Sequence, residues 1–168
     1  MELNYGTVYE LPAEDQELIK NMATNICNQD RSYFVDNFKI DKNMSLYNMN
    51  LNGFGAELTF CRLCGVEFDS SYDKTENHFN NADAILWNGL TVDVKTTTYQ
   101  SGKLLIRPGK EDSKVDLYAL MIGTFPMFRF AGWIEYENII NDKLLVDLGW
   151  GPGYCLPQHE LNKTLKYI

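Results

Sequence analysis

The stretch that decides the fold is residues 82–96, which read ADAILWNGLTVDVKT. Apolar and polar residues alternate on both sides of Asn88-Gly89, and Asn-Gly is a strong signal for a tight turn between two strands. The stretch therefore predicts a β-hairpin in which ADAIL pairs with LTVDVKT.

The apolar pattern also predicts the register of this hairpin. A two-residue loop would mix apolar and charged groups on both faces. A three-residue loop pairs Leu86 with Leu90 and makes one face wholly apolar, with Gly89 in the left-handed conformation that such loops need. In that register Asp83 lies directly opposite Asp93, with their Cβ atoms about 4.5–5.5 Å apart.

The runs around the hairpin predict the remaining elements. Residues 13–29 have a helical apolar spacing, and a second helix is expected over 53–65, with Asn52 as its N-cap and Gly65 at its end. Residues 30–52 show no clear period and read as a mixed connection. Further strands are expected at KLLIR (103–107), DLYALMIG (116–123) and MFRFAGWI (127–134), with short helices over 135–141 and after Pro157.

This order of elements predicts the α/β (α+β) class, with a mixed central sheet of about five strands flanked by helices. The length of 168 residues favours one compact domain. Within it, residues 1–50 are expected to form an N-terminal helical arm, and residues 51–168 the main domain.

The charge is negative overall but uneven. The net charge of −8 argues against an extended basic groove for nucleic acid. Residues 94–114 nevertheless carry +3, which leaves −11 for the rest of the chain. Two interpretations stay open: a local patch that holds a few phosphates, or ordinary solvated side chains. The basic residues of this segment are Lys95, Lys103, Arg107, Lys110 and Lys114.

Composition favours a reduced, cytoplasmic protein. No run of eighteen apolar residues exists, and the first residues lack the pattern of a secretory signal. Four cysteines in a chain of this length do not suggest a disulfide scaffold. Cys61 and Cys64 could begin a zinc site, but no second pair with suitable spacing follows, so buried free thiols are favoured.

The candidate chemistry lies on the hairpin. Asp93 and Lys95 are two residues apart on one strand, so both side chains point to the same face. With Asp83 on the partner strand, two carboxylates form an oxygen site suited to a hard cation such as Mg²⁺. A lysine beside such a metal can orient or help to deprotonate a water molecule, which is what phosphodiester hydrolysis requires.

These pieces resemble the PD-(D/E)xK nuclease superfamily, as it occurs in phage and bacterial proteins. The matching segments are GFGAE (53–57) and NADAILWNGLTVDVKTT (81–97), followed by KLLIRPG, DLYALMIG and FRFAGWI. The resemblance covers roughly residues 51–134. It implies a restriction-endonuclease-like core with a divalent metal at the edge of the sheet.

The resemblance also implies roles for individual residues. Asp83 and Asp93 would be metal ligands, with the Val94 carbonyl as another. Lys95 would be the water-activating lysine. Glu57 would match the helix glutamate that some members add, either to tune the site or to bind a second ion. The sequence departs from the family pattern at one position, where alanine precedes the first aspartate instead of proline.

The expected function is therefore Mg²⁺- or Mn²⁺-dependent hydrolysis of phosphodiester bonds in DNA, with Lys103 and Arg107 as candidate phosphate contacts. A homodimer would supply a groove that one acidic subunit lacks. The alternatives are a nuclease-fold binding module and a DNA-mimicking inhibitor, neither of which cleaves. An aspartate and a lysine on one strand can also be a solvated ion pair, so the motif depends on its context.

Overall fold

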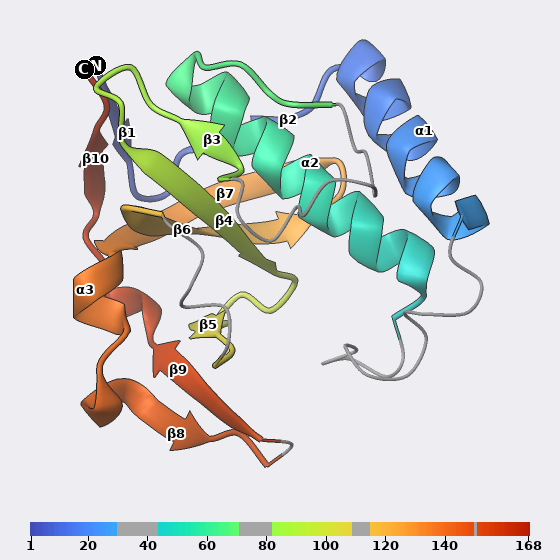
Figure 1. Ribbon diagram of the computed structural model, residues 1–168. Coiled ribbons are helices and arrows are strands. Elements are labelled where there is room, and N and C mark those ends of the chain that lie inside the picture. The colour runs from blue at the N-terminus through green and yellow to red at the C-terminus, as the bar shows by residue number, and fades with distance from the viewer. Residues whose placement is uncertain (30–43, 71–81, 109–114, 150) are drawn as a thin grey trace.

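The computed structural model describes residues 1–29, 44–70, 82–108, 115–149 and 151–168. At its centre is a five-stranded sheet in the order β2-β7-β6-β4-β3, in which β4 and β6 are parallel and the other neighbours are antiparallel (Figure 1). The predicted α+β class with a mixed sheet of about five strands flanked by helices is confirmed. The strands are β2 (Val8–Glu10), β3 (Ala84–Ile85), β4 (Thr91–Thr97), β6 (Leu117–Thr124) and β7 (Met127–Glu135).

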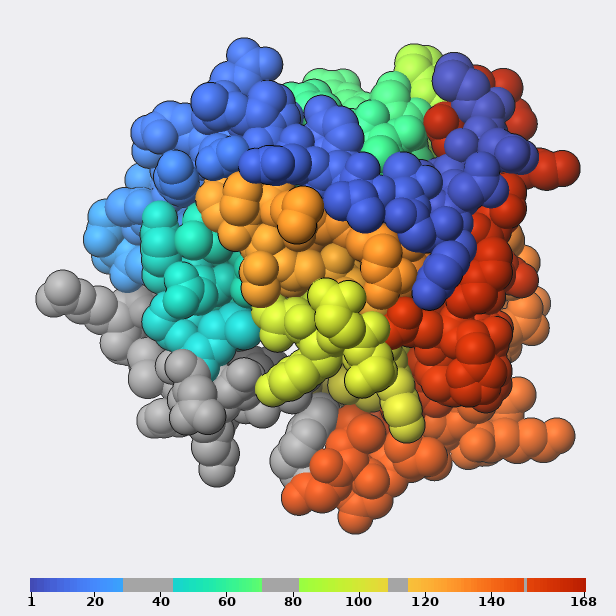
Figure 2. Space-filling model, turned by 180° about the vertical axis from the view of Figure 1, so that it is seen from behind, coloured from blue at the N-terminus to red at the C-terminus, as the bar shows by residue number. Residues whose placement is uncertain are grey.

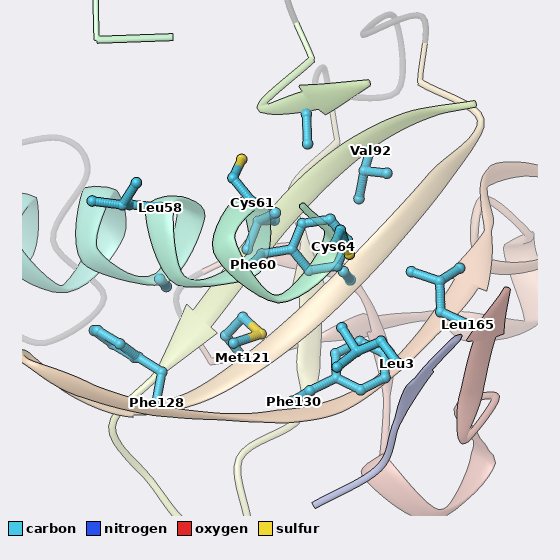
Figure 3. Close-up of a cluster of buried hydrophobic side chains, with 14 of the residues drawn as sticks. Leu3, Leu58, Phe60, Cys61, Cys64, Val92, Met121, Phe128, Phe130 and Leu165 are labelled. Atoms are coloured by element: carbon cyan, nitrogen blue, oxygen red, sulfur yellow. The ribbon is translucent and has the colours of Figure 1, made fainter. Parts of the chain in front are cut away.

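The long helix α2 (Leu46–Cys64) packs across one face of this sheet, and α1 (Ala13–Gln29) packs beside α2 (Figure 1). Phe60 of α2 meets Phe130 of β7, with their ring centroids 6.4 Å apart (Figure 3). Val92 and Val94 of β4 belong to the same buried cluster. Alternation along β4 therefore turns its intervening polar side chains to the opposite face.

None of the described helices is long and apolar enough to cross a membrane.

A second, three-stranded sheet packs against the other face of the central sheet. It has the order β5-β9-β8, formed by β5 (Leu104–Ile106), β9 (Pro152–Leu156) and β8 (Leu145–Asp147). The buried side chains of β5 and β9 form one cluster with those of β6 and β7, and with α3 (Tyr136–Ile139). KLLIR is therefore a strand, as predicted, but the expectation that it belongs to the central sheet was wrong. Leu104 and Ile106 are buried, and the strand pairs with β9, a strand that the sequence pattern does not predict.

The two ends of the chain pair with each other. β1 (Glu2–Asn4) runs antiparallel to β10 (Thr164–Lys166), and β2 forms the edge of the central sheet beside β7. The helix expected after Pro157 is wrong: a single 3-10 turn, η3 (Gln158–Glu160), is followed by β10. Leu165 is buried and its strand partner is Leu3, so burial and backbone pairing favour a strand here. The described part of the predicted arm thus contains two strands as well as α1.

The start of α2 also differs from the prediction, whereas its end agrees. The helix begins after Ser45, whose hydroxyl accepts a hydrogen bond from the Asn48 N–H at 3.1 Å. Asn52 lies inside the helix, and its side-chain oxygen accepts from the Phe125 N–H at 2.9 Å. An asparagine expected as a cap instead holds the turn between β6 and β7. Gly65 ends the helix in the left-handed conformation, with φ of 64°.

The hairpin has the predicted register. Ala84 pairs with Val92, and the Leu86 N–H donates to the Leu90 carbonyl at 2.9 Å. Gly89 has φ of 85°, as a three-residue loop requires. The regular pairing does not extend to Asp83. Its N–H donates to the carbonyl of Val92, although Val92 is the strand partner of Ala84.

An ion pair joins α1 to α2. Arg62 donates two hydrogen bonds to the buried Asp15 carboxylate, at 2.8 and 2.6 Å, while 42% of the Arg62 side chain stays exposed. The hydrogen bond from Arg62 lowers the pKa of Asp15 although burial opposes the shift.

We expect Asp15→Ala, Arg62→Ala and the double variant to give a coupling free energy of about 1–2 kcal/mol near pH 7. This lies between values for exposed pairs and for hydrogen bonds to charged groups, because solvent reaches one side of Arg62. The folded pKa of Asp15 lies below the unfolded value of about 3.9, so the coupling is present above about pH 4 and declines at lower pH. Denaturant unfolding at several pH values measures it, and a coupling that persists undiminished at low pH would contradict the assignment.

Candidate active site

Four of the predicted site residues come together beside the open edge of β4. Glu57 comes from α2, Asp83 from the residue before β3, and Asp93 and Lys95 from β4. All four are half-buried, and each of the other three contributes to the shifted pKa of Glu57. Because β3 begins only at Ala84, no described strand covers the β3 side of β4 beside Asp93, whereas β6 pairs with β4 on the other side. The cluster therefore forms where the hairpin opens.

Asp93 and Lys95 share one face of β4, as their spacing predicts. The Lys95 ammonium donates a hydrogen bond to the Asp93 carboxylate and forms an ion pair with it. The ammonium also lies 5.8 Å from the ring centroid of Tyr118, a fully buried side chain of β6. Tyr118 occupies the position paired with Asp93 across the two parallel strands. This aromatic side chain and the carboxylate together hold the lysine head group in place.

Asp83 connects the hairpin to the edge of β4. Its carboxylate accepts a hydrogen bond from the Val94 N–H at 2.7 Å, and the nearby Asp93 carboxylate contributes to its raised pKa. The two aspartates are therefore neighbours, but Asp83 is not the strand partner of Asp93 that the predicted register requires, because the pairing of β3 with β4 does not extend to Asp83. The N–H and C=O of one strand residue point toward the same neighbour, so the Val94 carbonyl faces this edge too.

Burial and neighbouring carboxylates raise the pKa values of Asp83 and Glu57. Burial raises the pKa of Asp83 to about 7, and the nearby Asp93 carboxylate adds to the shift. Burial, Asp83 and Asp93 raise the pKa of Glu57 well above its ordinary value. Burial lowers the pKa of Lys95, but the two aspartates raise it by more. Three carboxyl groups thus face one ammonium, and full ionisation would leave negative charge in excess.

The donor set fits a hard divalent cation by its chemistry. Glu57, Asp83 and Asp93 offer only oxygen donors, and burial, together with repulsion from neighbouring carboxylates, raises the pKa values of Glu57 and Asp83. Among the described residues, no three acidic, histidine or cysteine side chains are gathered closely enough to hold a metal ion. Asp93 is instead bonded to Lys95, and Asp83 to a backbone N–H. A divalent ion would take over the charge compensation that Lys95 now supplies to the carboxylates.

No protein-family model matches the chain, and no curated protein matches it either. Membership of the PD-(D/E)xK superfamily therefore remains a proposal.

The two predicted phosphate contacts, Lys103 and Arg107, do not contribute to the shifted pKa values of the cluster. Lys103 is exposed just before β5, and Arg107 is half-buried just after it and engaged in an interaction of its own. Neither charge is among those that shift the pKa values of Glu57, Asp83 and Lys95. Lys110 and Lys114, from the same basic segment, lie outside the described residues.

Sequence reasoning missed two side chains that border the cluster. Tyr118 carried no local signal, because its place depends on the pairing of β4 with β6. Cys61 lies four residues after Glu57, a spacing that puts both on one side of a helix. Its thiol donates to the Asp83 carbonyl at 3.8 Å, and burial raises its pKa to about 12. Cys61 and Cys64 are buried and free, as favoured from the sequence.

Proposed function

We propose that this protein is a Mg²⁺- or Mn²⁺-dependent nuclease of the PD-(D/E)xK superfamily that hydrolyses phosphodiester bonds in DNA. The observation that carries the proposal is the half-buried cluster in which three carboxyl groups face one lysine. A structural ion pair needs only one carboxylate, and crowding further acids beside it is costly unless a cation binds there. Groups with such strongly shifted pKa values concentrate at functional sites.

The residues divide into ligands and a positioning group. Asp83 and Asp93 would hold the ion, with the Val94 carbonyl beside them, and Glu57 would tune the site or hold a second ion. When bound, the ion makes water more acidic and neutralises charge that develops on the phosphate. Lys95, kept in place by Asp93 and Tyr118, would orient the attacking water by donating or sharing a proton.

A cleavage panel tests the proposal. Circular and linear DNA and the matching RNA are incubated with the protein in Mn²⁺, in Mg²⁺ and in EDTA. We expect cleavage of DNA in either divalent ion and none in EDTA. Cleavage that survives EDTA would contradict the metal requirement, and intact substrates in every arm would contradict the nuclease activity.

A binding module with the same fold but no cleavage is the second candidate. The net charge of −8 favours this candidate. The ion pair between Lys95 and Asp93 favours it too, because Lys95 already compensates the charge of the Asp93 carboxylate. Calorimetric titration with Mn²⁺ separates the two candidates. A nuclease should bind the ion and lose this binding in Asp83→Asn, whereas a binding module in which Lys95 alone compensates the carboxylates should not bind it in the cluster.

We also propose a cytoplasmic location and, for DNA binding, a homodimer. All four cysteines are free, which suits a compartment that keeps thiols reduced. A dimer would combine two short basic segments into the groove that a single acidic subunit lacks.

The double variant Lys103→Ala/Arg107→Ala is expected to bind DNA more weakly and to depend less on salt. Removing one phosphate contact reduces the slope of log affinity against log salt by about 0.7–0.9, so removing two reduces it by about 1.4–1.8. Fluorescence anisotropy without divalent ions measures the slope. The control is Lys20→Ala, which removes an exposed lysine of α1. An unchanged slope would show that DNA binds to another surface.

A further inference from the structure

A pocket lies on the face of the central sheet to which Lys95 points. Its volume is about 260 Å³, and the segments that line it come from β2, the turn after β4, β6 and β7. Figure 2 shows this side of the molecule, where the N-terminal segment, the turn near residue 100 and the β6–β7 region adjoin (blue, yellow-green and orange). The lining includes Val8, Thr98, Gln100, Ile122, Thr124 and Arg129.

Arg129 brings to this pocket a guanidinium with one unpartnered nitrogen. Its Nη1 atom is buried without a hydrogen-bond partner, and no described carboxylate forms an ion pair with it. Buried polar groups in folded proteins are almost always hydrogen-bonded, so an unpaired guanidinium nitrogen indicates a missing partner. Since the donor belongs to a permanent cation, the partner that suits it best is an anion.

A second cation and an aromatic ring strengthen this environment. The Arg129 guanidinium lies 5.4 Å from the ring centroid of Tyr5, and the Lys163 ammonium lies 4.5 Å from the same centroid. Lys163 bonds to the backbone carbonyl of Gln158, which is neutral, and forms no ion pair with a described carboxylate. Two cations thus adjoin one ring on a protein whose net charge is −8.

Strand register relates Arg129 to the carboxylate cluster. Thr97 of β4 pairs with Ile122 of β6, which in turn pairs with Arg129 of β7. Paired residues share a face, so Arg129 points to the same side as Thr97 and, by alternation, as Lys95. Two strand spacings across and two residues along place the backbones of Arg129 and Lys95 about 12 Å apart.

We infer that the pocket binds a phosphate group through Arg129, and that this phosphate belongs to a nucleic-acid strand whose scissile bond lies at the Glu57–Lys95 cluster. The inference rests on the proposed nuclease function. A guanidinium offers paired donors that match phosphate oxygens, and the side chains of Thr98 and Gln100 add neutral donors. A free phosphate ion presents the same oxygens, so the test separates the two sources.

The test compares the parent protein with Arg129→Gln, Arg129→Lys and the control Lys143→Gln, an exposed lysine of η2 (Asp142–Leu144). Anisotropy of a labelled DNA oligonucleotide in EDTA gives the affinity at several salt concentrations. Arg129→Gln is expected to weaken binding about tenfold or more and to reduce the salt slope by about 0.7–0.9. Arg129→Lys should keep the slope but lose part of the affinity, because the bidentate donors are gone. Lys143→Gln should change neither quantity.

Titration with inorganic phosphate shows whether the pocket binds the phosphate of a nucleic-acid strand or a free phosphate ion. Loss of DNA affinity in Arg129→Gln supports the strand phosphate. If Arg129→Gln loses binding of inorganic phosphate but keeps the parental DNA affinity, the pocket is a site for free phosphate, and the assignment to a nucleic-acid strand is refuted. Parental values for both ligands overturn the inference altogether. Thermal melting checks the folding of each variant, and should Arg129→Gln fail to fold, parental DNA affinity of Arg129→Lys would overturn the role of the guanidinium.

The same proteins separate this inference from the nuclease proposal. If the parent cleaves DNA in Mn²⁺ but Arg129→Gln binds DNA as tightly as the parent, the phosphate subsite is refuted and the nuclease proposal is not. DNA binding that depends on Arg129, in a protein that cleaves nothing, would support the subsite as a phosphate site and refute the nuclease activity.

Discussion

Asp83→Asn is expected to abolish metal-dependent DNA cleavage while leaving the metal-free protein at least as stable as the parent. The substitution replaces a proposed metal ligand with a neutral amide of the same shape. Loss of at least about 100-fold in rate is expected, since even the outer partners of metal ligands contribute about 10–100-fold. Stability should not fall, because the carboxylate that is removed is crowded by Asp93 and Glu57 and has its pKa raised to about 7.

Asp93→Asn should abolish cleavage as well, but with a different effect on stability. Asp93 is the ion-pair partner of Lys95, so its loss leaves a half-buried ammonium with less compensation. Melting temperatures in EDTA should therefore place Asp93→Asn below Asp83→Asn. Glu17→Gln, which changes an exposed carboxylate on α1, serves as the control for both. Parental cleavage by either aspartate variant would refute the proposed metal site.

The parts of the fold that the sequence predicted are those set by local pattern. The hairpin register followed from alternating burial between Ala84 and Val92, together with the need for a left-handed glycine at position 89. A one-residue shift would have moved a full row of apolar side chains out of the core, so the pattern allowed only one register. Asp93 and Lys95 share a face for the same local reason.

The parts that were missed depend on contacts between distant segments. β2 and β10 are three residues long, too short for a period to be recognised, and each is stabilised by pairing with a distant strand. The buried residues of KLLIR suit a central strand and a covering strand equally well. Only the pairing with β9 decides between them.

The same distinction holds for the candidate site. Glu57, Asp83, Asp93 and Lys95 were found because their spacing and the family resemblance mark them. Tyr118 and Arg129 are brought to this face by pairing of β6 with β4 and β7. Their segments, DLYALMIG and FRFAGWI, were recognised as strands, but nothing in them marked either side chain as part of a site. Residues that complete a site from across a sheet become visible only when the strand order is known.

Lys95→Met is expected to reduce turnover by about 10²–10⁴-fold while the metal still binds. Methionine keeps much of the side-chain volume beside Tyr118 but provides no ammonium to orient the water. Asp83, Asp93 and Glu57 would remain in place, so the oxygen donors for the ion persist.

The variant should also respond more strongly to the metal than the parent does. In the metal-free protein, Lys95 is the cation that faces three carboxyl groups, and its removal leaves their repulsion uncompensated. The free energy of unfolding in EDTA should fall, and Mn²⁺ should restore more of it than it adds to the parent, since a ligand stabilises the folded state to which it binds. Lys20→Met, an exposed lysine on α1, should show neither effect. Cleavage at the parental rate would refute a catalytic role for Lys95. An equal Mn²⁺ response in variant and parent would show that the ion binds away from the carboxylates that Lys95 now faces.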